Sequence, residues 1–527
     1  MFNFLKYNPP KHKEDFDLVF NEKPTCINNA VYSSEVSENI EENLEIIKGR
    51  LHSDKNGDVV IREFYFRIQN KKIKGIVVSV DGLSSTSSIN EFIIKPLIDN
   101  DIVIENEKTS VLDIKTYVEN ILPQMQVSYN NDASAVIDSV NFGNAALFVD
   151  GCRNAAVVDV KSWEHRGIGT PLNEDVVQGP HEAFNEMLRC NTALIRKTLN
   201  ISDLIVENLT LGKISRTPAS LAYIHGTVNE ALLKEIKKKI FSISQEYVLS
   251  VFDIEKILEE RNILFIPQII TTERPDKVSR ALVEGRVALL LNGSSHVLIL
   301  PSNITDIASS PEDAYLRKPY SIFIKIIRII AIVLSLLTPG LYLAVTQYHG
   351  EVILTDMYIT INNASSKIPF LPFTEIIIME LSFELIKEAA IRIPGAIGSS
   401  LGIVGGLILG QTAVNAGLVS PIVIIIVSIC GISSFAIPSY SLSFAFRIMR
   451  FVYIFAAHLC GLVGVLALLV IQAGFVLGTK SFGVPICVPF SPSTSKHPFI
   501  NAVFDTHSDV HPPDYLKSGK LKNNRER

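Results

Sequence analysis

The feature that most constrains this chain is its division into parts of different polarity. From Tyr320 to Leu477 the residues are mostly apolar, whereas the preceding part is rich in Glu, Asp and Lys, and the stretch from Lys480 is polar and basic again. A run of roughly 20 apolar residues is long enough to span a bilayer as a helix. The sequence therefore predicts a large α/β-type N-terminal region followed by an α-helical multi-pass membrane domain.

Four segments of the apolar part are candidates for crossing a membrane: Ser321–Val345, Ala396–Leu409, Ile422–Ile437 and Phe451–Leu477. The last one is long enough to contain a bend at Gly461 or Gly464. Arg317 and Lys318 come directly before the first segment, and excess basic charge marks the cytoplasmic side of a membrane. We therefore expect a cytoplasmic N-terminal region and about four to six crossings. The basic pair Arg447 and Arg450 is also expected on the cytoplasmic side.

The N-terminal region contains strand and helix patterns that occur twice. Asp58–Ile68 and Lys74–Val80 have the composition of strands, and a helical run follows at Ile89–Ile98. The stretches IVVSVDGLSSTSSINEFIIKPL and SLAYIHGTVNEALLKEIKKKI share one layout: an apolar strand, a Gly-containing loop and an Asn-initiated amphipathic helix. This shared layout predicts two related α/β subdomains.

A hairpin and a helix are expected in the second section. Ala145–Val149 and Ala155–Val160 flank Asp150-Gly151, which is a hairpin-turn pattern, and a helix is predicted over Gly179–Leu199. The resulting plan is a flexible tail at 1–40, a first α/β subdomain at 41–140, a second at 141–310, a transmembrane domain at 311–480 and a cytoplasmic tail at 481–527.

Several classes of function find no support in the sequence. The net charge of −5 gives no reason to expect a nucleic-acid partner. The six cysteines are scattered, with no Cys/His cluster at metal spacing, and are interpreted as free thiols. The chain has no GxGxxG, P-loop, GxSxG or HExxH motif. We therefore expect no catalytic residues, no cofactor and no metal.

The apolar part contains a glycine stripe that ends in polar residues. Gly398, Gly402, Gly406 and Gly410 recur at every fourth position, which allows close approach of two helices in lipid. Val404, Ile408, Gln411 and Asn415 share another face of the same helix. One interpretation is a packing device or bend. The other interpretation is a subunit interface or pore wall. In a pore, Val404 and Ile408 would lie at the constriction, and Gln411 and Asn415 would line a water-filled entrance.

A second candidate site in the apolar part is acidic. Glu380, Glu384 and Glu388 form one stripe of a helix with Lys387 beside it, and the opposite face is apolar. The simpler interpretation is an interfacial helix with a solvated face. The functional interpretation is a ring of carboxylates that attracts cations.

The densest charged stretch of the N-terminal region is TTERPDKVSRALVEGR. Pro275 suits the first turn of a helix, Gly285 suits its end, and a hairpin is expected from Arg286–Leu291 and Val297–Leu300. Asp276 with Arg280, and Arg280 with Glu284, are spaced for ion pairs. The stretch is interpreted as a solvated or interdomain salt-bridged helix, with an anion site as the alternative. Its candidate interdomain or signalling residues are Glu273, Arg274, Asp276, Arg280, Glu284 and Arg286.

Three phrases carry a resemblance to a known family. From about Asn43 to Pro492 the chain resembles the A subunits of bacterial spore germination receptors of the GerA type. The resemblance rests on IPQIITTERPDKVSRALVEGRVALLLNGSSHVLILPS, on GIVGGLILGQTAVNAGLVSP and on SFGVPICVPFSP. TERPDK and EGRVA are its most specific parts, together with a GP.E.F.E.L..N pattern at Gly179–Asn191.

The resemblance implies a location, partners and an activity. Such proteins lie in the spore inner membrane with a cytoplasmic N-terminal region of two α/β subdomains, and they act with B and C partner subunits. The B partner is thought to take the nutrient, and the A subunit is thought to form a homo-oligomeric, nutrient-gated channel for monovalent cations. The alternatives are a non-conducting scaffold subunit and a transporter with a discontinuous helix at Ala413–Ser420.

Overall fold

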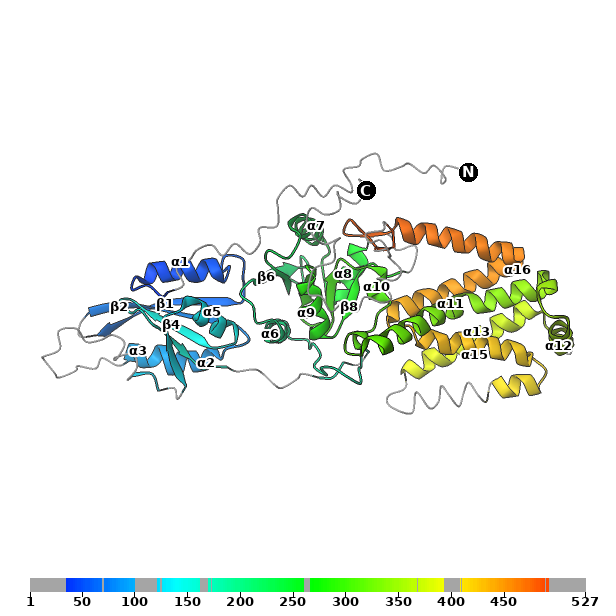
Figure 1. Cartoon of the computed structure of the whole chain (residues 1–527), viewed down its shortest axis with the longest axis horizontal. Coiled ribbons are helices and arrows are strands. Elements are labelled where there is room, and N and C mark those ends of the chain that lie inside the picture. Colours follow the sequence, from blue (N-terminus) through cyan, green and yellow to red (C-terminus); the bar gives the residue numbers. More distant parts are fainter. Residues whose placement is uncertain are drawn as a thin grey trace, which may run out of the picture.

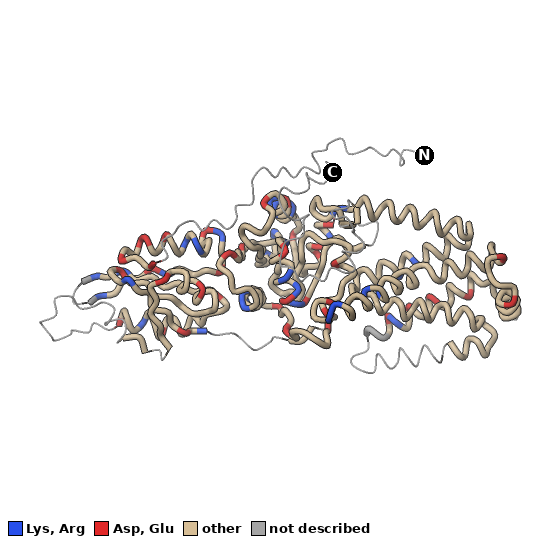
Figure 2. The backbone as a smooth tube through the Cα atoms, in the orientation of Figure 1, with Lys and Arg blue, Asp and Glu red and all other residues tan. Residues whose placement is uncertain are grey.

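The two α/β subdomains and a helical bundle follow one another along the long axis of the molecule (Figure 1). The computed structural model describes residues 35–68, 71–99, 121–123, 126–161, 169–171, 173–259, 266–366, 368–392, 408, 410–488 and 490–491. Figure 2 shows charged residues throughout the two subdomains and few within the bundle. The polarity division of the sequence therefore corresponds to a division of the fold.

The first subdomain is a five-stranded antiparallel sheet covered by helices on both faces. Its elements are α1 (Ile40–Arg50), β1 (Val59–Ile68), β2 (Lys71–Val80), α2 (Thr86–Ile89), α3 (Lys95–Asp99), β3 (Val127–Asn130), α5 (Ala133–Asn141), β4 (Ala145–Val149) and β5 (Ala155–Val158). The strand order is β1-β2-β4-β5-β3. α1 and α5 cover one face, and α2 and α3 cover the other. β4 and β5 are buried along their whole length because both faces are covered.

The second subdomain repeats this arrangement element by element. Its elements are α6 (Leu188–Thr198), β6 (Leu204–Leu211), β7 (Thr217–Ile224), α7 (Glu230–Phe241), α8 (Val251–Leu258), β8 (Ile270–Thr272), α9 (Pro275–Val283), β9 (Val287–Leu291) and β10 (Val297–Leu300). The strand order β6-β7-β9-β10-β8 matches that of the first sheet position for position. α7 and α8 cover one face, and α6 and α9 cover the other.

The expected elements occur close to their predicted positions, with three differences. The hairpin of β4 and β5, expected in a second subdomain that begins at residue 141, belongs to the first sheet, so the boundary between the subdomains lies after β5. The helix predicted over Gly179–Leu199 begins only at Leu188. The Asn191 side chain, which is buried, accepts from the Asn185 N–H at 2.9 Å and donates to the Asn185 carbonyl at 2.6 Å, which holds the preceding segment out of the helix. The first subdomain's loop helix is capped by Ser85, whereas Asn90 lies inside it at the start of a π turn.

A buried ion pair joins the two subdomains. Arg196 of α6 donates from Nε to Asp58 Oδ2 at 2.5 Å and from Nη2 to Asp58 Oδ1 at 2.7 Å. Next to it, the Gly57 N–H donates to the Val206 carbonyl, and the Val206 N–H donates to Asn56 Oδ1. The start of β1 is therefore fixed against β6. These contacts hold the two sheets in a defined position relative to each other.

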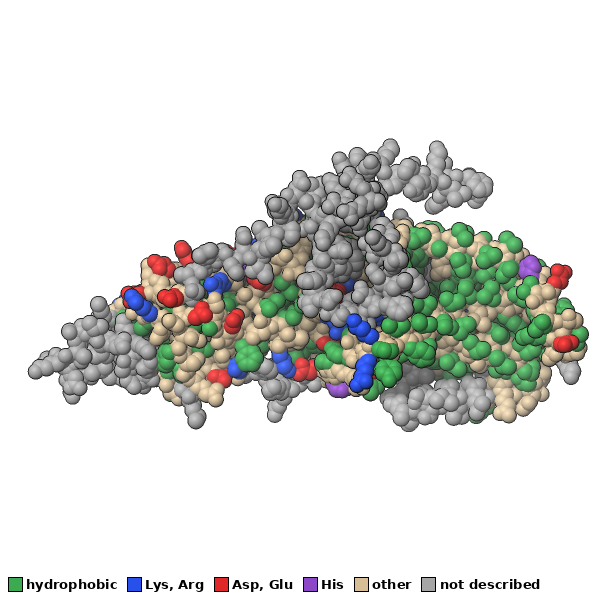
Figure 3. All heavy atoms as spheres, in the orientation of Figure 1, with side chains coloured by type: hydrophobic (Ala, Val, Ile, Leu, Met, Phe, Trp, Pro, Cys, Tyr) green, Lys and Arg blue, Asp and Glu red, His purple; other side chains and the backbone are tan. Residues whose placement is uncertain are grey.

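The remaining described elements form the helical bundle and its connections. They are α10 (Ile304–Ile307), η5 (Pro311–Ala314), α11 (Lys318–Tyr348), η6 (Gly350–Val352), α12 (Thr355–Ser365), α13 (Pro372–Arg392), α15 (Pro421–Phe435), α16 (Tyr440–Gly478), β11 (Lys480–Ser481) and β12 (Val484–Pro485). α11 and α16 are long and apolar enough to cross a membrane, and α15 is a shorter apolar helix. Figure 3 shows that hydrophobic side chains cover the visible face of the bundle.

α16 folds back on itself at Gly461, one of the two predicted bend positions. Gly461 has φ 59° and ψ −141°, which no helical residue adopts. The Tyr453 hydroxyl reaches Gln472 Oε1 at 2.5 Å, although these residues are 19 positions apart. A straight helix would separate them by roughly 28 Å at about 1.5 Å per residue. The two halves of α16 therefore run antiparallel, as Figure 1 shows.

Three of the four predicted membrane segments coincide with helices of the structure. Ser321–Val345 lies within α11, Ile422–Ile437 overlaps α15, and Phe451–Leu477 lies within α16. Ala396–Leu409 falls outside the described residues except for Ile408.

Candidate functional site

A buried arginine lies at the centre of the bundle. Arg450, in the first half of α16, is 1% exposed. Its Nη1 donates to Glu380 Oε2 of α13 at 2.6 Å, and its Nε donates to the Ser335 carbonyl of α11 at 2.9 Å. This one side chain therefore connects three helices of the bundle, α16, α13 and α11. Glu380 and Ser335 supply partners for Arg450 inside the bundle, and its place on the cytoplasmic side stays a prediction.

A proline explains why the Ser335 carbonyl is available. In a helix this oxygen would accept from the N–H four residues later, and that residue is Pro339, which has no N–H. Both Arg450 Nε and the Cys430 thiol donate to the freed oxygen, the thiol at 3.0 Å. Pro339 thus creates an acceptor inside the bundle that the buried guanidinium uses.

Two further ties hold α13 to its neighbours. Arg447 Nε donates to Glu384 Oε2 at 2.8 Å, and the same guanidinium also contacts Glu384 through Nη2. Lys387 Nζ donates to Ser434 Oγ of α15 at 2.7 Å. α13 is therefore bound by charged or polar contacts to α15 and α16, and Arg450 of α16 links it to α11.

The acidic stripe of α13 faces the interior, contrary to the interpretation of a solvated face. Glu380 is fully buried, Glu384 is partly buried, and only Glu388 is exposed. On the apolar side, Leu385 is 71% exposed. Arginines of α16 neutralise two of the three charges that the carboxylate-ring interpretation requires. The sequence signal for this pairing was present, because opposite charges in apolar segments seldom remain unpaired.

Half of the glycine-rich candidate site lies outside the described residues, namely Gly398, Gly402, Val404 and Gly406. Of the remaining members, Ile408, Gln411 and Asn415 are exposed, and Gly410 is buried with Ile424 near its Cα. None of the hydrogen bonds described for this structure uses the Gln411 or Asn415 side chain. Polar side chains on an apolar bundle need water or another protein surface as partner.

The polar segment ends in a defined turn. The Leu418 N–H donates to the Ala413 carbonyl and the Gly417 N–H donates to the Val414 carbonyl. Gly417 has φ 67°, so this is a Schellman motif that ends the helix of residues 410–415. Ser420 then caps the start of α15. The helix is therefore interrupted between 416 and 420.

The TERPDK stretch forms hydrogen bonds with the segment that links the two subdomains. Arg274 is fully buried and donates to the carbonyls of Glu174 and Pro180, at 3.1 and 2.9 Å. Its Nε also donates to Asp276 Oδ1 at 3.0 Å. Glu273 Oε1 accepts from Asn173 at 2.8 Å. These contacts place TERPDK at a junction between segments, as the interdomain interpretation expects.

The ion pairs within this stretch differ from the predicted ones. Asp276 pairs with Arg274 and accepts from the Tyr315 hydroxyl, whereas Arg280 lies over the Tyr315 ring at 5.7 Å. Glu284 pairs with Arg286 at 3.0 Å. Asp276 and Glu284 therefore pair with arginines two positions away, and Arg280 contacts the Tyr315 ring.

The protonation of two of these groups follows from their contacts. Burial acts to raise the pKa of the Asp276 carboxyl, but hydrogen bonds from Arg274 and Tyr315 outweigh it and leave that pKa below its usual value. Burial and the neighbouring Asp276 carboxylate raise the pKa of the Tyr315 phenol to about 12. Asp276 is therefore ionised and Tyr315 neutral near pH 7.

The same junction reaches the bundle. Arg286 pairs with Asp306 at 2.5 Å, and Arg328 of α11 pairs with Asp313 of η5 at 2.6 Å. The hydrophobic core on the α6 and α9 side of the second sheet also includes Leu442 and Phe446 of α16. The second subdomain is therefore in direct contact with α11 and with the start of α16.

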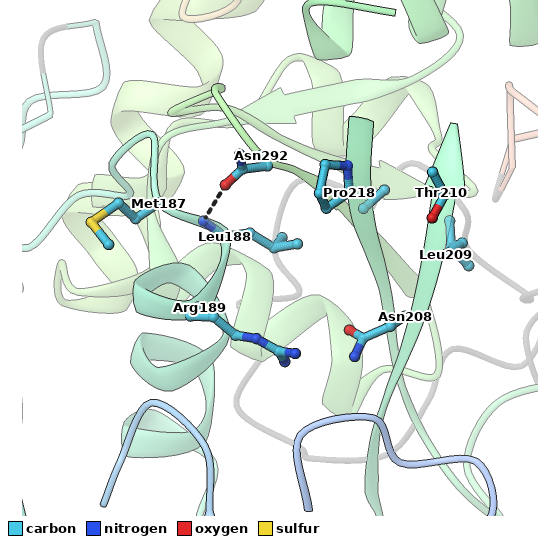
Figure 4. Close-up of a pocket in the computed structure, with 9 residues that line it drawn as sticks. Met187, Leu188, Arg189, Asn208, Leu209, Thr210, Pro218 and Asn292 are labelled. Carbon is cyan, nitrogen blue, oxygen red and sulfur yellow. Dashed lines mark hydrogen bonds between the residues drawn. The ribbon is translucent and has the colours of Figure 1, made fainter. Parts of the chain in front are cut away.

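A groove of about 460 Å³ opens on the second subdomain near the first (Figure 4). Arg189 and Asn208 lie on opposite sides of it, and Asn292 Oδ1 accepts from the Leu188 N–H at 3.2 Å. Arg189 also pairs with Asp81 of the first subdomain at 3.2 Å. No sequence pattern indicates this groove, because its lining comes from separate segments of the chain.

Across the described ranges, no cluster of three or more His, Cys, Asp or Glu side chains is placed to hold a metal ion. The charged groups described above pair mainly with one another, as in Arg450–Glu380, Arg447–Glu384 and Arg274–Asp276. Fold and site together define a protein with a duplicated α/β region and a helical bundle that contains two helices long and apolar enough to cross a membrane.

Comparisons with known proteins identify the family. The family model described as Bacillus/Clostridium GerA spore germination protein matches residues 45–508. The chain is 33% identical to spore germination protein KA of Bacillus subtilis (strain 168), over 84% of this chain and 80% of that protein. It is 31% identical to spore germination protein GerLA of Bacillus cereus, over 88% and 92%. The chain therefore belongs to the GerA family of spore germination proteins.

One solved structure is also similar. The crystal structure of the N-terminal domain of the A subunit of the Bacillus megaterium spore germinant receptor GerK3 matches with 26% sequence identity and a TM-score of 0.39. The match covers 50% of this chain and 96% of that one.

Proposed function

We propose that this chain is the membrane subunit of a nutrient-sensing spore germination receptor, and that its copies assemble into a nutrient-gated channel for monovalent cations. Family membership supports the receptor role. The observation that supports the channel is the exposure of Gln411 and Asn415 on an otherwise apolar bundle. A neighbouring copy and a water-filled path between copies would supply the partners that lipid cannot.

The proposed placement follows from the arrangement of the bundle. α11, α13, α15 and the two halves of α16 cross the spore inner membrane together with the glycine-rich segment before Ile408. The α/β region then lies in the cytoplasm, because Arg317 and Lys318 precede α11. The B and C subunits are the proposed partners, with the B subunit taking the nutrient. No nucleic acid takes part.

In this proposal, gating depends on the polar contacts that hold α13 to its neighbouring helices. Arg450, Arg447 and Lys387 hold this helix against α16 and α15, and the glycine-rich segment begins just after α13. A nutrient shifts the population of open channels only if the open arrangement binds it more tightly. The proposed signal from the second subdomain is a movement that reaches α11 through the Asp313–Arg328 ion pair.

Potassium efflux tests the channel. Cells expressing the chain with its B and C partners are compared as wild type and as Val404→Ala, which widens the proposed constriction. Val470→Ala, at an exposed position of α16, is the matched control. We expect nutrient-dependent efflux in the wild type and the control, and constitutive efflux in Val404→Ala. Unchanged efflux in Val404→Ala with normal assembly supports the scaffold role instead.

The transporter alternative has one observation in its favour. The helix of residues 410–415 ends at Gly417, and α15 begins at Pro421. The helical structure is therefore interrupted within the bundle. Interrupted helices form solute sites in transporters. Saturable uptake of one solute by the wild type would favour this alternative, whereas a channel releases cations without it.

A further inference from the structure

The residues that follow α16 run back into the second subdomain. We call residues 479–488 the strap; it contains β11 and β12, which pair as a short antiparallel hairpin, and it overlaps the phrase SFGVPICVPFSP. Every residue from 481 to 488 except Gly483 is buried. Connecting segments normally lie on the surface of a protein. The burial of the strap therefore shows that it is built into the fold of the second subdomain.

Side chains of the strap enter both hydrophobic cores of this subdomain. Phe482, at the tip of the hairpin, is 3% exposed and belongs to the core that α7 and α8 cover. The Lys239 ammonium of α7 lies 4.8 Å from the centre of the Phe482 ring. Ile486 and Cys487 belong to the core on the opposite face of the sheet, which α6 and α9 cover. The strap therefore packs against both layers of helices at once.

Hydrogen bonds attach the strap to one end of the second sheet. Ser481 Oγ donates to the Gln268 carbonyl at 2.8 Å and accepts from the Ser302 N–H at 3.2 Å. Gln268 precedes β8 and Ser302 follows β10, which are neighbouring strands. The Ile304 N–H, at the start of α10, donates to the Ile486 carbonyl at 2.8 Å. The segment that leads into the bundle and the segment that leaves it are therefore joined on the second subdomain.

The backbone of the hairpin turn is strained at Phe482. This residue has φ 49° and Gly483 has φ 82°. Two successive positive φ angles define a type I′ turn, whose first position is normally Asn, Asp or Gly. A bulky residue adopts such a conformation only where its surroundings hold it there. Withdrawal of the ring from the core would lose its burial but relieve this strain, so the bound and released strap differ less in free energy than burial alone would make them.

We propose that the strap is a latch that holds the second half of α16 against the second subdomain, and that Phe482 is its release point. α16 ends at Gly478, directly before the strap, so a movement of the strap reaches the helix without an intervening loop. The inference rests on the proposed function insofar as release of the latch opens the channel. A signal in the second subdomain opens it only by favouring the released strap over the bound one.

Labelling of Cys487 measures release of the strap without requiring conduction. Cys487 is 7% exposed, so a water-soluble maleimide reaches its thiol only when the strap opens. The purified receptor complex of this chain with its B and C subunits is labelled, and the rate at each cysteine is measured by mass spectrometry of its peptides. Phe482→Asn keeps a residue suited to positive φ but removes the ring. It should raise the Cys487 rate by at least about tenfold, because burial of an aromatic ring contributes more than the free energy of a factor of ten.

Two controls and a second variant accompany this measurement. Cys152, buried in the first subdomain, should keep its rate, and Phe241→Asn, which removes an exposed ring at the end of α7, should change neither rate. Ser481→Ala covers the case in which Phe482→Asn fails to assemble, and should raise the Cys487 rate by about two- to tenfold, the range for one hydrogen bond. An unchanged Cys487 rate in the variants that assemble overturns the latch. So does an equal rise at Cys152, because it shows general unfolding.

Potassium efflux from cells expressing the same variants with the B and C partners tests the link to the channel. We expect Phe482→Asn to leak potassium without nutrient, as Val404→Ala does, and Phe241→Asn to stay closed. A leak in Val404→Ala with none in Phe482→Asn, although its Cys487 is labelled rapidly, retains the channel and overturns the latch. Rapid labelling of Cys487 in Phe482→Asn with no efflux from any chain, the wild type included, retains release of the strap and overturns the channel.

Discussion

Arg450 and Glu380 form a buried ion pair between the first half of α16 and α13, with Nη1 2.6 Å from Oε2. Both side chains are almost completely buried. The guanidinium would be left with an unpaired Nε if Pro339 did not free the Ser335 carbonyl. The pair therefore depends on a third helix, and the three residues act as one unit in holding α13.

Removing one partner of this pair should be costly. Arg450→Leu leaves the Glu380 charge buried without its cation, which typically costs about 3–5 kcal/mol. The double variant Arg450→Leu with Glu380→Gln removes both charges, so we expect it to recover a large part of that loss. Thermal unfolding of the purified complex measures both. Additive losses in the double variant would show that the two residues do not stabilise each other.

The pair between the subdomains gives a second prediction. Arg196 binds both oxygens of Asp58 through Nε and Nη2, a geometry that a lysine cannot reproduce. We expect Arg196→Lys to lower the free energy of unfolding by about 1.5–3 kcal/mol, the range for hydrogen bonds to charged groups. Denaturant unfolding of the full-length chain measures the loss.

Arg153→Lys is the matched control. Arg153 pairs with Glu38 at 2.7 Å, but both side chains are mostly exposed, and such pairs contribute little. A similar loss of stability in the two variants would mean that burial does not determine the value of the Arg196–Asp58 pair.

Much of the fold could be predicted because its signals are local. Strand composition gave β1 and β2, and the repeated strand, loop and helix layout indicated related subdomains, which have the same strand order in the structure. Glycine in a long apolar segment indicated the bend at Gly461. Each of these signals depends on residues close together in the chain.

The remaining features depend on partners far apart in the sequence. Glu380 and Arg450 are 70 positions apart, so helical periodicity gave the face of Glu380 but not the environment that face meets. The late start of α6 is an exception with a local cause, because the side chain of Asn191 satisfies the backbone of Asn185 six positions earlier. The contact between Glu375 and Ser420 could not be predicted because Ser420 is the N-cap of another helix, 45 positions away.

A pH dependence follows from a carboxyl on α8. Burial and, secondly, the neighbouring Glu259 charge raise the pKa of Glu255 to about 7. Between its unfolded pKa of about 4.5 and this value, the folded state binds a proton that the unfolded state has released, so stability falls as pH rises through that range and levels off above it.

Glu255→Gln tests this dependence. The variant should show a smaller fall in unfolding temperature than the wild type between pH values of about 4.5 and 7. Glu246→Gln removes an exposed carboxylate just before α8 and should follow the wild type. Parallel curves for Glu255→Gln and wild type would mean that Glu255 has the same proton affinity in the folded and unfolded chain.

The reversal of α16 gives the last prediction. Gly461 has φ 59°, and an added Cβ would lie 3.0 Å from Cγ of Tyr348. Gly461→Ala should therefore cost about 1–3 kcal/mol, the range for a residue held in a sparsely populated conformation. Its structural readout is cross-linking of Tyr453→Cys to Gln472→Cys by a short bifunctional maleimide, because the native side chains at these positions meet at their tips only if α16 folds back. We expect efficient cross-linking with Gly461, reduced cross-linking with Gly461→Ala, and no change with Gly474→Ala, where an added Cβ meets nothing within 4 Å. Because a straight α16 cannot bring positions 453 and 472 together, absence of the cross-link in the Gly461 background would contradict the antiparallel arrangement of its halves.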